Sequence, residues 1–246
     1  STQYIMTTLE ELGLLKMDFL GLRTLTVIQD TKDLVKLNRG IDVEFDKEMN
    51  DPNVYKQWQD GNSVGIFQFE SQGMTNFMKE LKPDCLEDII AGVSLYRPGP
   101  MDQIPRYIAN KKDPDHAVYT HDSLRPILNV TYGCMVYQEQ VMQIVRDLAG
   151  YSLGRADLVR RAMGKKKLDV MAKEREIFIN GQVDDDGNII VPGCVRNGID
   201  AESANTIFDE MAEFAKYAFN KSHAAAYAVL SYQTAYLKTY YPAEFM

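Results

Sequence analysis

The sequence lacks the features that mark membrane and secreted proteins. No apolar run approaches the ~20 residues that a membrane-spanning helix needs, and no signal-peptide pattern follows Ser1. The three cysteines, Cys85, Cys134 and Cys194, lie too far apart in the sequence to predict a disulfide framework or a zinc site. We therefore expect a cytoplasmic protein.

Positive charge is also scarce, and it is unevenly placed. The chain has 27 lysine and arginine residues against 35 aspartate and glutamate residues, a net charge of −8. This balance argues against nucleic-acid binding over the whole surface. Basic residues nevertheless dominate the segment Arg155–Arg175. The segment predicts a local site for phosphate groups, with a solvated helical face as the alternative.

No internal repeat, low-complexity tract or linker divides the 246 residues, so we expect one compact, mainly α-helical unit with a few short strands. Apolar spacing and capping residues predict helices within residues 22–40, 51–61, 72–82, 84–95, 136–150, 154–164, 200–219 and 222–240. Asp51 and Asp200 are expected caps, and Asp84 with Glu87 forms an expected capping box. Strands are predicted at 14–21 and 64–69, and a hairpin with an Asp-Gly turn at 181–193.

One carboxylate interrupts the apolar stretch LLKMDFLGL, residues 14–22. If this stretch is a strand that ends at Gly21, side-chain alternation puts Lys16 and Asp18 on the same face. A paired charge at a half-buried strand end would explain the pattern. The alternative is a carboxylate held on a rigid strand to bind a metal ion, and this stretch alone leaves both interpretations open.

The stretch SLYRPGPM contains Arg97 followed by Pro98, Gly99 and Pro100. These residues exclude a helix and predict a rigid turn that presents the arginine at a fixed place, as recognition of a phosphate or carboxylate requires. The alternative is a structural loop in which Arg97 pairs with a carboxylate.

Basic residues also lie along a predicted helix in YSLGRADLVRRAMGKKK. Arg160 and Arg161 are about 100° apart around that helix, so one is expected to face a ligand while the other braces the helix. Gly164 is expected to end the helix and to let Lys165 turn toward the same surface.

A third group falls at the start of the last long helix, where Lys221, His223 and Tyr227 occur in NKSHAAAY. His223 and Tyr227 are one helical turn apart on one face. A lysine, a helix N-terminus and an aromatic ring together predict a site for a triphosphate beneath a base. Packing in the core is the alternative for Tyr227.

The chain closely resembles the alpha subunits of bacterial DNA polymerase III, the C family of replicative polymerases. The resemblance runs from Thr2 to Met246 and rests on LGLLKMDFLGLRTLT, VGIFQFES, SLYRPGPM, YGCMVYQEQVM, AGYSLGRADLVRRAMGKK and FNKSHAAAYAVLSYQTAYLKTYYPAEFM. It implies a piece of such a protein, with 1–22 as a partial palm strand region and 23–246 as the helical fingers domain. A free-standing protein of this length is the alternative.

The resemblance implies that Asp18 is one of three palm carboxylates that hold two Mg²⁺ ions. The other two would lie in an aspartate-x-aspartate motif upstream of it, and no such motif precedes Asp18 in this sequence. Two-metal catalysis needs several carboxylates from adjacent strands, so the chain alone is expected to be inactive. Lys16 would offset anionic charge near the primer end or the α-phosphate.

The resemblance also implies that the fingers bind the incoming deoxynucleoside triphosphate (dNTP). Expected contacts are Arg160, Arg161 and Lys165 with the triphosphate, Lys221, His223 and Tyr227 near the nascent base pair, and Arg97 near the nucleotide or template. Gln138 and Glu139 are expected to brace the arginines.

The implied partners are primer–template DNA, the rest of the polymerase chain, the sliding clamp and other replisome subunits, with no membrane. The alternative function is a non-catalytic helical module that binds nucleic acid or polyphosphate through Arg155–Arg175. A preference for triphosphate with magnesium would favour the polymerase, and steep loss of binding with salt would favour the module.

Overall fold

The fold is mainly helical, as the sequence predicts. The computed structural model describes residues 2–15, 17, 21–164 and 168–246. Its α-helices are α1 (Met6–Glu11), α2 (Arg23–Arg39), α3 (Pro52–Gln59), α4 (Gln72–Leu81), α5 (Leu86–Leu95), α6 (Ile104–Lys112), α7 (Arg125–Leu128), α8 (Gln138–Ala149), α9 (Leu153–Gly164), α10 (Leu168–Asn180), α11 (Ala201–Phe214), α12 (Lys221–Tyr240) and α13 (Pro242–Phe245). Short 3-10 helices are η1 (Pro100–Gln103), η2 (Pro114–His116), η3 (Asp122–Leu124) and η4 (Asn129–Thr131).

The predicted hairpin is also present. Strands β1 (Gln182–Val183) and β2 (Ile189–Val191) pair antiparallel. Gly187 has φ 84° in the turn between them, a conformation that favours glycine. Among the described helices, none combines the length and apolar character that a bilayer crossing requires.

Capping side chains fix several helix starts where the sequence predicts them. Asp51, Ser71 and Asp200 each accept a hydrogen bond from a backbone N–H two or three residues further along, at 2.8, 3.3 and 2.8 Å. These bonds satisfy donors that have no partner within the helix itself. The capping box predicted at Asp84 and Glu87 is wrong, because α5 begins one residue later with Cys85 as its N-cap and no side-chain cap.

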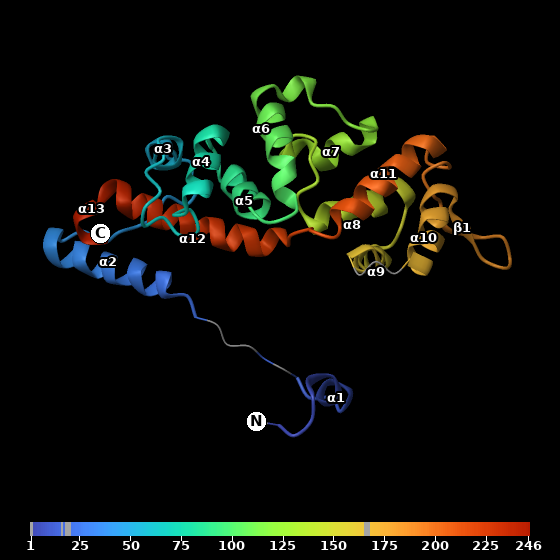
Figure 1. Cartoon of the computed structure of the whole chain (residues 1–246), viewed down its shortest axis with the longest axis horizontal. Helices are drawn as coiled ribbons and strands as arrows, with labels where there is room; N and C mark the ends of the chain where they lie inside the picture. Colours follow the sequence, from blue (N-terminus) through green and yellow to red (C-terminus); the bar gives the residue numbers. More distant parts are fainter. Residues whose placement is uncertain (1, 16, 18–20, 165–167) are drawn as a thin grey trace.

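Helix α12 runs through one half of the molecule, and α3, α4 and α5 lie along it (Figure 1). Helix α12 packs against α5 and α3, and its small residues Ala224, Ala228 and Ala235 are buried in this half. Buried aromatic residues such as Trp58 and Tyr232 fill this first core cluster. A smaller apolar group joins α2 to the C-terminal part of α12.

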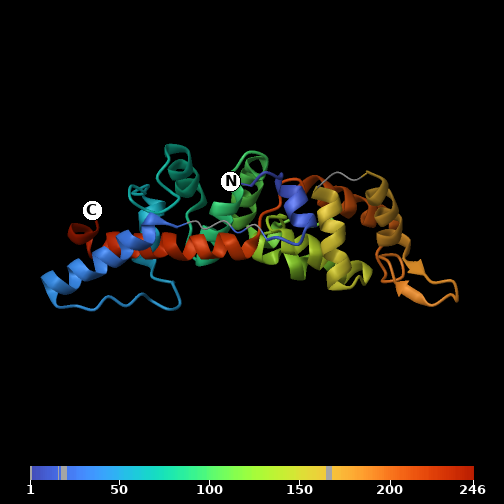
Figure 2. The same ribbon diagram turned by 90° about the horizontal axis from the view of Figure 1, so that it is seen from below.

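A second core cluster lies beyond the N-terminus of α12. Helices α7 to α11 form it, around buried side chains that include Ile144, Phe178 and Phe208. The two clusters lie end to end, so the described chain is elongated (Figures 1 and 2). The described residues thus form two core clusters where one compact unit was expected, and the chain passes between the clusters within residues 108–124, 128–134, 137–141 and 211–224.

The strand predicted at 64–69 is a series of turns. Side chains of α12 replace a neighbouring strand as hydrogen-bond partners for Phe67. The backbone N–H of Phe67 donates to Thr234 Oγ1 at 3.1 Å, and its carbonyl accepts from Ser231 Oγ at 2.9 Å. Because these tertiary contacts satisfy the backbone, the apolar alternation does not produce a strand.

The other predicted strand, 14–21, lies partly outside the described residues. The described residues of this stretch are not in a strand. Two of them, Leu15 and Met17, are 82% and 64% exposed. Helix α1 has no buried residue and lies apart from the two core clusters (Figure 1). The described part of residues 2–22 therefore contributes no side chain to either core.

Candidate functional site

Helices α8 and α12 begin side by side at the junction between the two core clusters. Tyr137 and Phe219 form a parallel bridge, and Gln138 N donates to the Phe219 carbonyl at 2.9 Å. Asn220 caps α12 by accepting from His223 N at 2.8 Å. Two helix N-termini, each carrying partial positive charge, are thus fixed next to each other.

Glu139 closes the N-terminus of α12. Its carboxylate accepts from Lys221 N at 3.0 and 3.2 Å and from Asn220 Nδ2 at 3.0 Å. The expectation that Glu139 braces the arginines is therefore wrong. The helix start had been expected to attract a phosphate, and a carboxylate of the chain itself already occupies that position.

The side chains of Lys221, His223 and Tyr227 all contact their neighbours at this helix start. Lys221 Nζ lies 3.0 Å from a Glu87 carboxylate oxygen and 5.1 Å from the centre of the Tyr137 ring. The rings of His223 and Tyr227 are 4.3 Å apart between centroids. His223 is exposed and Tyr227 half-buried, so the pair presents an aromatic surface at the edge of the first core cluster.

Arg160 and Arg161 converge on one carboxylate, that of Asp157. Arg160 donates to Asp157 Oδ1 at 2.7 and 3.1 Å and to Gln138 Oε1 at 3.2 Å. Arg161 Nε lies 2.7 Å from Asp157 Oδ2. The Arg160 side chain is 23% exposed and that of Arg161 is 62% exposed. Arg160 is therefore the braced residue, with Gln138 as a partner as expected, and Arg161 is the one free to turn outward.

We expect the pKa of the Asp157 carboxyl to depend on both arginines. It lies below the ordinary carboxyl range, first because Arg160 donates a hydrogen bond to the ionised form and then because of the charges of Arg160 and Arg161. A lowered folded-state pKa means that this carboxylate stabilises the fold above the unfolded pKa, and that the contribution is lost as pH falls through the folded pKa.

Carboxyl NMR titration checks this expectation. Arg160→Ala should raise the Asp157 pKa more than Arg161→Ala does, because Arg160 contributes the larger effect. Asp184 is a matched control: its pKa is lowered by hydrogen bonds from Asn188 and should stay low in both variants. An Asp157 pKa that neither substitution moves would contradict the shared ion-pair arrangement.

Arg97 holds the junction together through backbone groups. Its guanidinium donates to the Ser94 carbonyl at 2.9 Å and the Tyr217 carbonyl at 2.8 Å, and it lies 4.1 Å from the centre of the Phe219 ring. Burial lowers its pKa. The turn after it depends on Gly99, with φ 102°, where an added Cβ would lie 2.4 Å from the Tyr217 ring. The partners are carbonyls, and the sequence alternative of a carboxylate partner is wrong.

The structure brings most of the predicted residues together through direct contacts. Arg97 contacts Phe219, which contacts His223 and then Tyr227. Arg160 joins this group through Gln138, which bonds to Phe219. Three predicted residues, Lys16, Asp18 and Lys165, lie outside the described residues. Asp157 is a further residue of this group that was not predicted, although its position three and four residues before the arginines is the spacing of helical ion pairs.

One group of metal-ligating side chains, Asp84, Cys85 and Asp88, lies within the described residues. The Lys111 ammonium already fills this cluster: it contacts Asp88 Oδ2 and lies 3.3 Å from Asp84 Oδ1. Burial, and after it the nearby Asp88 charge, raises the pKa of the Cys85 thiol to about 11. A neutral thiol and a resident ammonium do not fit a divalent metal ion.

Comparison with known proteins identifies the class of this helical domain. The family described as the finger domain of the bacterial DNA polymerase III alpha subunit matches residues 24–186. The chain belongs to this family. It is 51% identical to DNA polymerase III subunit alpha of Thermus aquaticus, and 51% and 46% identical to those of Rickettsia felis and Aquifex aeolicus.

The match covers 99 to 100% of this chain but only 19 to 20% of these three relatives. The chain thus spans about a fifth of the length of the curated relatives it matches. This ratio confirms the expectation, drawn from the resemblance, that the residues correspond to a segment of such a protein.

Proposed function

We propose that this chain is the palm-to-fingers segment of a replicative, template-directed DNA polymerase and that it binds the incoming dNTP. The observation that carries the proposal is that Arg97, Arg160 and Lys221 meet at the paired starts of α8 and α12. Arg161 lies beside them, because it shares the Asp157 carboxylate with Arg160. The proposal divides the chain into a partial palm region, 1–22, and the fingers, 23–246, of which the family match covers residues 24–186.

The triphosphate is proposed to bind at Arg161 and Arg160, with Lys165 beyond the end of α9. Arg161 is the more exposed of the two arginines. The Asp157 carboxylate that it contacts indicates where an anionic oxygen can bind its guanidinium. A triphosphate carries more charge than one carboxylate and competes for the same guanidinium donors. Cations in this position would stabilise charge on the leaving pyrophosphate.

The base is proposed to lie against the ring pair of His223 and Tyr227, with Lys221 beside it. Shape, through the ring faces, would then select the nascent pair. Arg97 has a changed role in this proposal, because its guanidinium is engaged with the carbonyls of Ser94 and Tyr217. It positions the chain that leads into α12 and acts on the nucleotide through that chain.

Catalysis is proposed to require Asp18 and Lys16. The polymerase family depends on divalent metal ions in general, and we propose Mg²⁺, held by Asp18 together with carboxylates from outside this sequence. The described residues offer only the Asp84, Cys85 and Asp88 group, which does not fit a metal ion. The isolated chain is therefore proposed to be inactive, and its parent polymerase to be a nucleotidyltransferase of the cytoplasm.

The alternative, a module that holds nucleic acid or polyphosphate through Arg155–Arg175, has less support. Arg155 pairs with Glu174, and Arg175 with Asp209, so both ends of the basic segment are already neutralised within the fold. The proposed partners are instead primer–template DNA, dNTP, the rest of the polymerase chain, the sliding clamp and other replisome subunits.

Titration of the 246-residue chain with dATP and Mg²⁺ tests the proposal. Saturable binding is expected by calorimetry, with Arg160→Ala and Arg161→Ala each weakening it about tenfold, because each removes a charge-assisted hydrogen bond to phosphate. Arg146→Ala is the matched control. Arg146 is an exposed arginine near the other end of α8, paired with Asp147, and its loss should leave the affinity unchanged.

Two outcomes would count against the triphosphate site. Binding that none of the three arginine variants weakens would indicate general affinity for polyanions. Tighter binding of long single-stranded DNA than of dATP, lost steeply with salt, would favour the alternative module. An absence of saturable dATP binding would show that this chain does not form the site by itself.

A further inference from the structure

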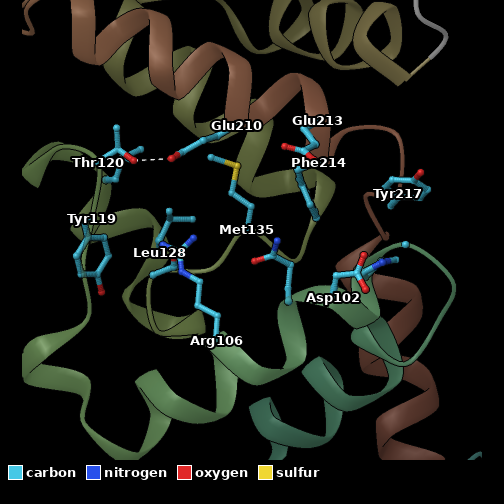
Figure 3. A pocket seen from close by; sticks show the side chains of 15 residues that line it. Asp102, Arg106, Tyr119, Thr120, Leu128, Met135, Glu210, Glu213, Phe214 and Tyr217 are labelled. Carbon is cyan, nitrogen blue, oxygen red and sulfur yellow. Dashed lines mark hydrogen bonds between the residues drawn. The ribbon is translucent and has the colours of Figure 1, made fainter.

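A cavity of about 340 Å³ lies between the two core clusters (Figure 3). One wall comes from η1 and α6, the opposite wall from α11, and the third from the segment that contains Thr120 and α7. Its volume is in the range of small-molecule sites. None of the residues assigned above to nucleotide binding lines it.

Acidic side chains dominate the charge of this cavity. Asp102, Glu210 and Glu213 line it, and Arg106 is the basic residue among its lining residues. Glu210 accepts from Thr120 Oγ1 at 2.7 Å, which fixes one carboxylate on the α11 wall. In the described part of the chain, no lysine or arginine forms an ion pair with any of the three carboxylates.

The single arginine of the cavity, Arg106, does not neutralise its three carboxylates. Its Nη2 donates to the Val118 carbonyl at 3.3 Å and to the Gly133 carbonyl at 3.5 Å, so the guanidinium is bound to backbone groups of the third wall. The cavity keeps a formal charge of −2 from its three carboxylates and one guanidinium. A cation is therefore the complementary ligand.

The remaining surface of the cavity is apolar and aromatic. Phe214 and Met135 face its interior between the carboxylates, and Tyr217 lies at the end near Asp102 (Figure 3). Aromatic faces attract cations, and a flexible methionine adapts to flat apolar groups. We infer that this cavity binds an organic cation, an amine or guanidine joined to an aromatic or apolar body.

Such a ligand would touch both halves of the fingers at once. Asp102 belongs to η1, beside the first core cluster, whereas Glu213 belongs to α11, beside the second. A cation held between Asp102 and Glu213 would link η1 to α11, and so the first core cluster to the second. The inference concerns binding alone and does not rest on the proposed function, since none of its residues is assigned to nucleotide.

Methionine-methyl NMR of the 246-residue chain tests the inference with three probes: 4-phenylbutylamine, 4-phenylbutyrate and putrescine. The amine should shift the Met135 methyl signal saturably in the millimolar range, the scale expected for a ligand of this size. The anion lacks the charge and putrescine lacks the ring, so both should bind at least about fivefold more weakly. The Met78 methyl, buried in the first core cluster, should not move.

Two single substitutions from opposite walls test the charge assignment. Asp102→Asn and Glu213→Gln should each weaken 4-phenylbutylamine binding about fivefold, because each removes one partly solvated charge contact. Both residues are exposed, so the variants should fold. Glu202→Gln, in the first turn of α11, is the matched control and should bind like the parent chain.

Any of four results would overturn the inference. The anion could shift Met135 as strongly as the amine, the amine could shift Met78 equally, or both wall variants could bind the amine as well as Glu202→Gln does. A lack of saturable Met135 shift with 4-phenylbutylamine would also overturn it. Since no nucleotide is present in this experiment, its failure would leave the triphosphate proposal unaffected.

Discussion

Replacing Lys111 by methionine is expected to lower the free energy of unfolding by about 3–5 kcal/mol, the cost of leaving a buried charge without its partner. The Asp88 side chain is 1% exposed and that of Lys111 is 11% exposed. The ammonium contacts Asp88 Oδ2 and lies 3.2 Å from the Lys82 carbonyl. Methionine keeps the length and the helix propensity of lysine but removes this charge.

A neighbouring lysine provides the matched control for this substitution. Lys112 is exposed on the same helix, α6, and Lys112→Met should change the free energy of unfolding by no more than about 0.5 kcal/mol. Urea unfolding measures both variants on the same scale. Adding Asp88→Asn to Lys111→Met should recover part of the loss, because the buried carboxylate is then neutral.

The pH dependence of unfolding separates a charge effect from a packing effect. Burial raises the pKa of Asp88 in the folded chain even with Lys111 beside it. A carboxyl with a raised folded pKa takes up a proton on folding, so stability falls as pH rises from the ordinary carboxyl pKa through the raised value. Without Lys111 the pKa rises further, and the deficit of Lys111→Met should be larger at pH 8 than at pH 5. A deficit that is the same at both pH values would indicate lost packing.

Local signals explain which parts of the fold could be predicted from the sequence. The starts of α3 and α11 follow from Asp51 and Asp200, because a cap acts on a backbone N–H only two or three residues away. The failed strand at 64–69 has a non-local cause: its alternating pattern is real, but Ser231 and Thr234 of α12 supply the hydrogen bonds that a second strand would have made. No local pattern reveals such partners.

The candidate site also combines features that the sequence predicts with features that it does not. The spacing of Arg160 and Arg161 correctly indicates that they differ in exposure, and the family resemblance indicates which segments meet. The role of Glu139 could not be predicted, because it caps a helix that begins 82 residues later. The pair of Asp88 and Lys111, 23 residues apart, is hidden for the same reason. Long-range pairs depend on the packing of the whole fold and leave no periodic trace in the sequence.

Replacing Asp18 by alanine is expected to abolish primer extension by the polymerase chain that contains this segment. A loss of about 10³-fold or more is the scale for removing a ligand of a two-metal centre, where the ions supply several kcal/mol of transition-state stabilisation. The substitution should leave the unfolding of the 246-residue chain nearly unchanged, within about 0.5 kcal/mol. The described neighbours Leu15 and Met17 are 82% and 64% exposed, so this stretch adds little to the cores of the chain.

Two control variants test whether the loss of primer extension is specific to Asp18. Asp30→Ala removes an exposed carboxylate of α2 that is close to Asp18 in sequence, and it should retain extension. Asp84→Ala removes a 72% exposed member of the carboxylate cluster that Lys111 already fills, and should also retain it. Extension retained by Asp18→Ala would remove the metal assignment from Asp18. Extension lost in Asp84→Ala but kept in Asp18→Ala would instead place the metal at the α5 cluster, against the geometry of Lys111.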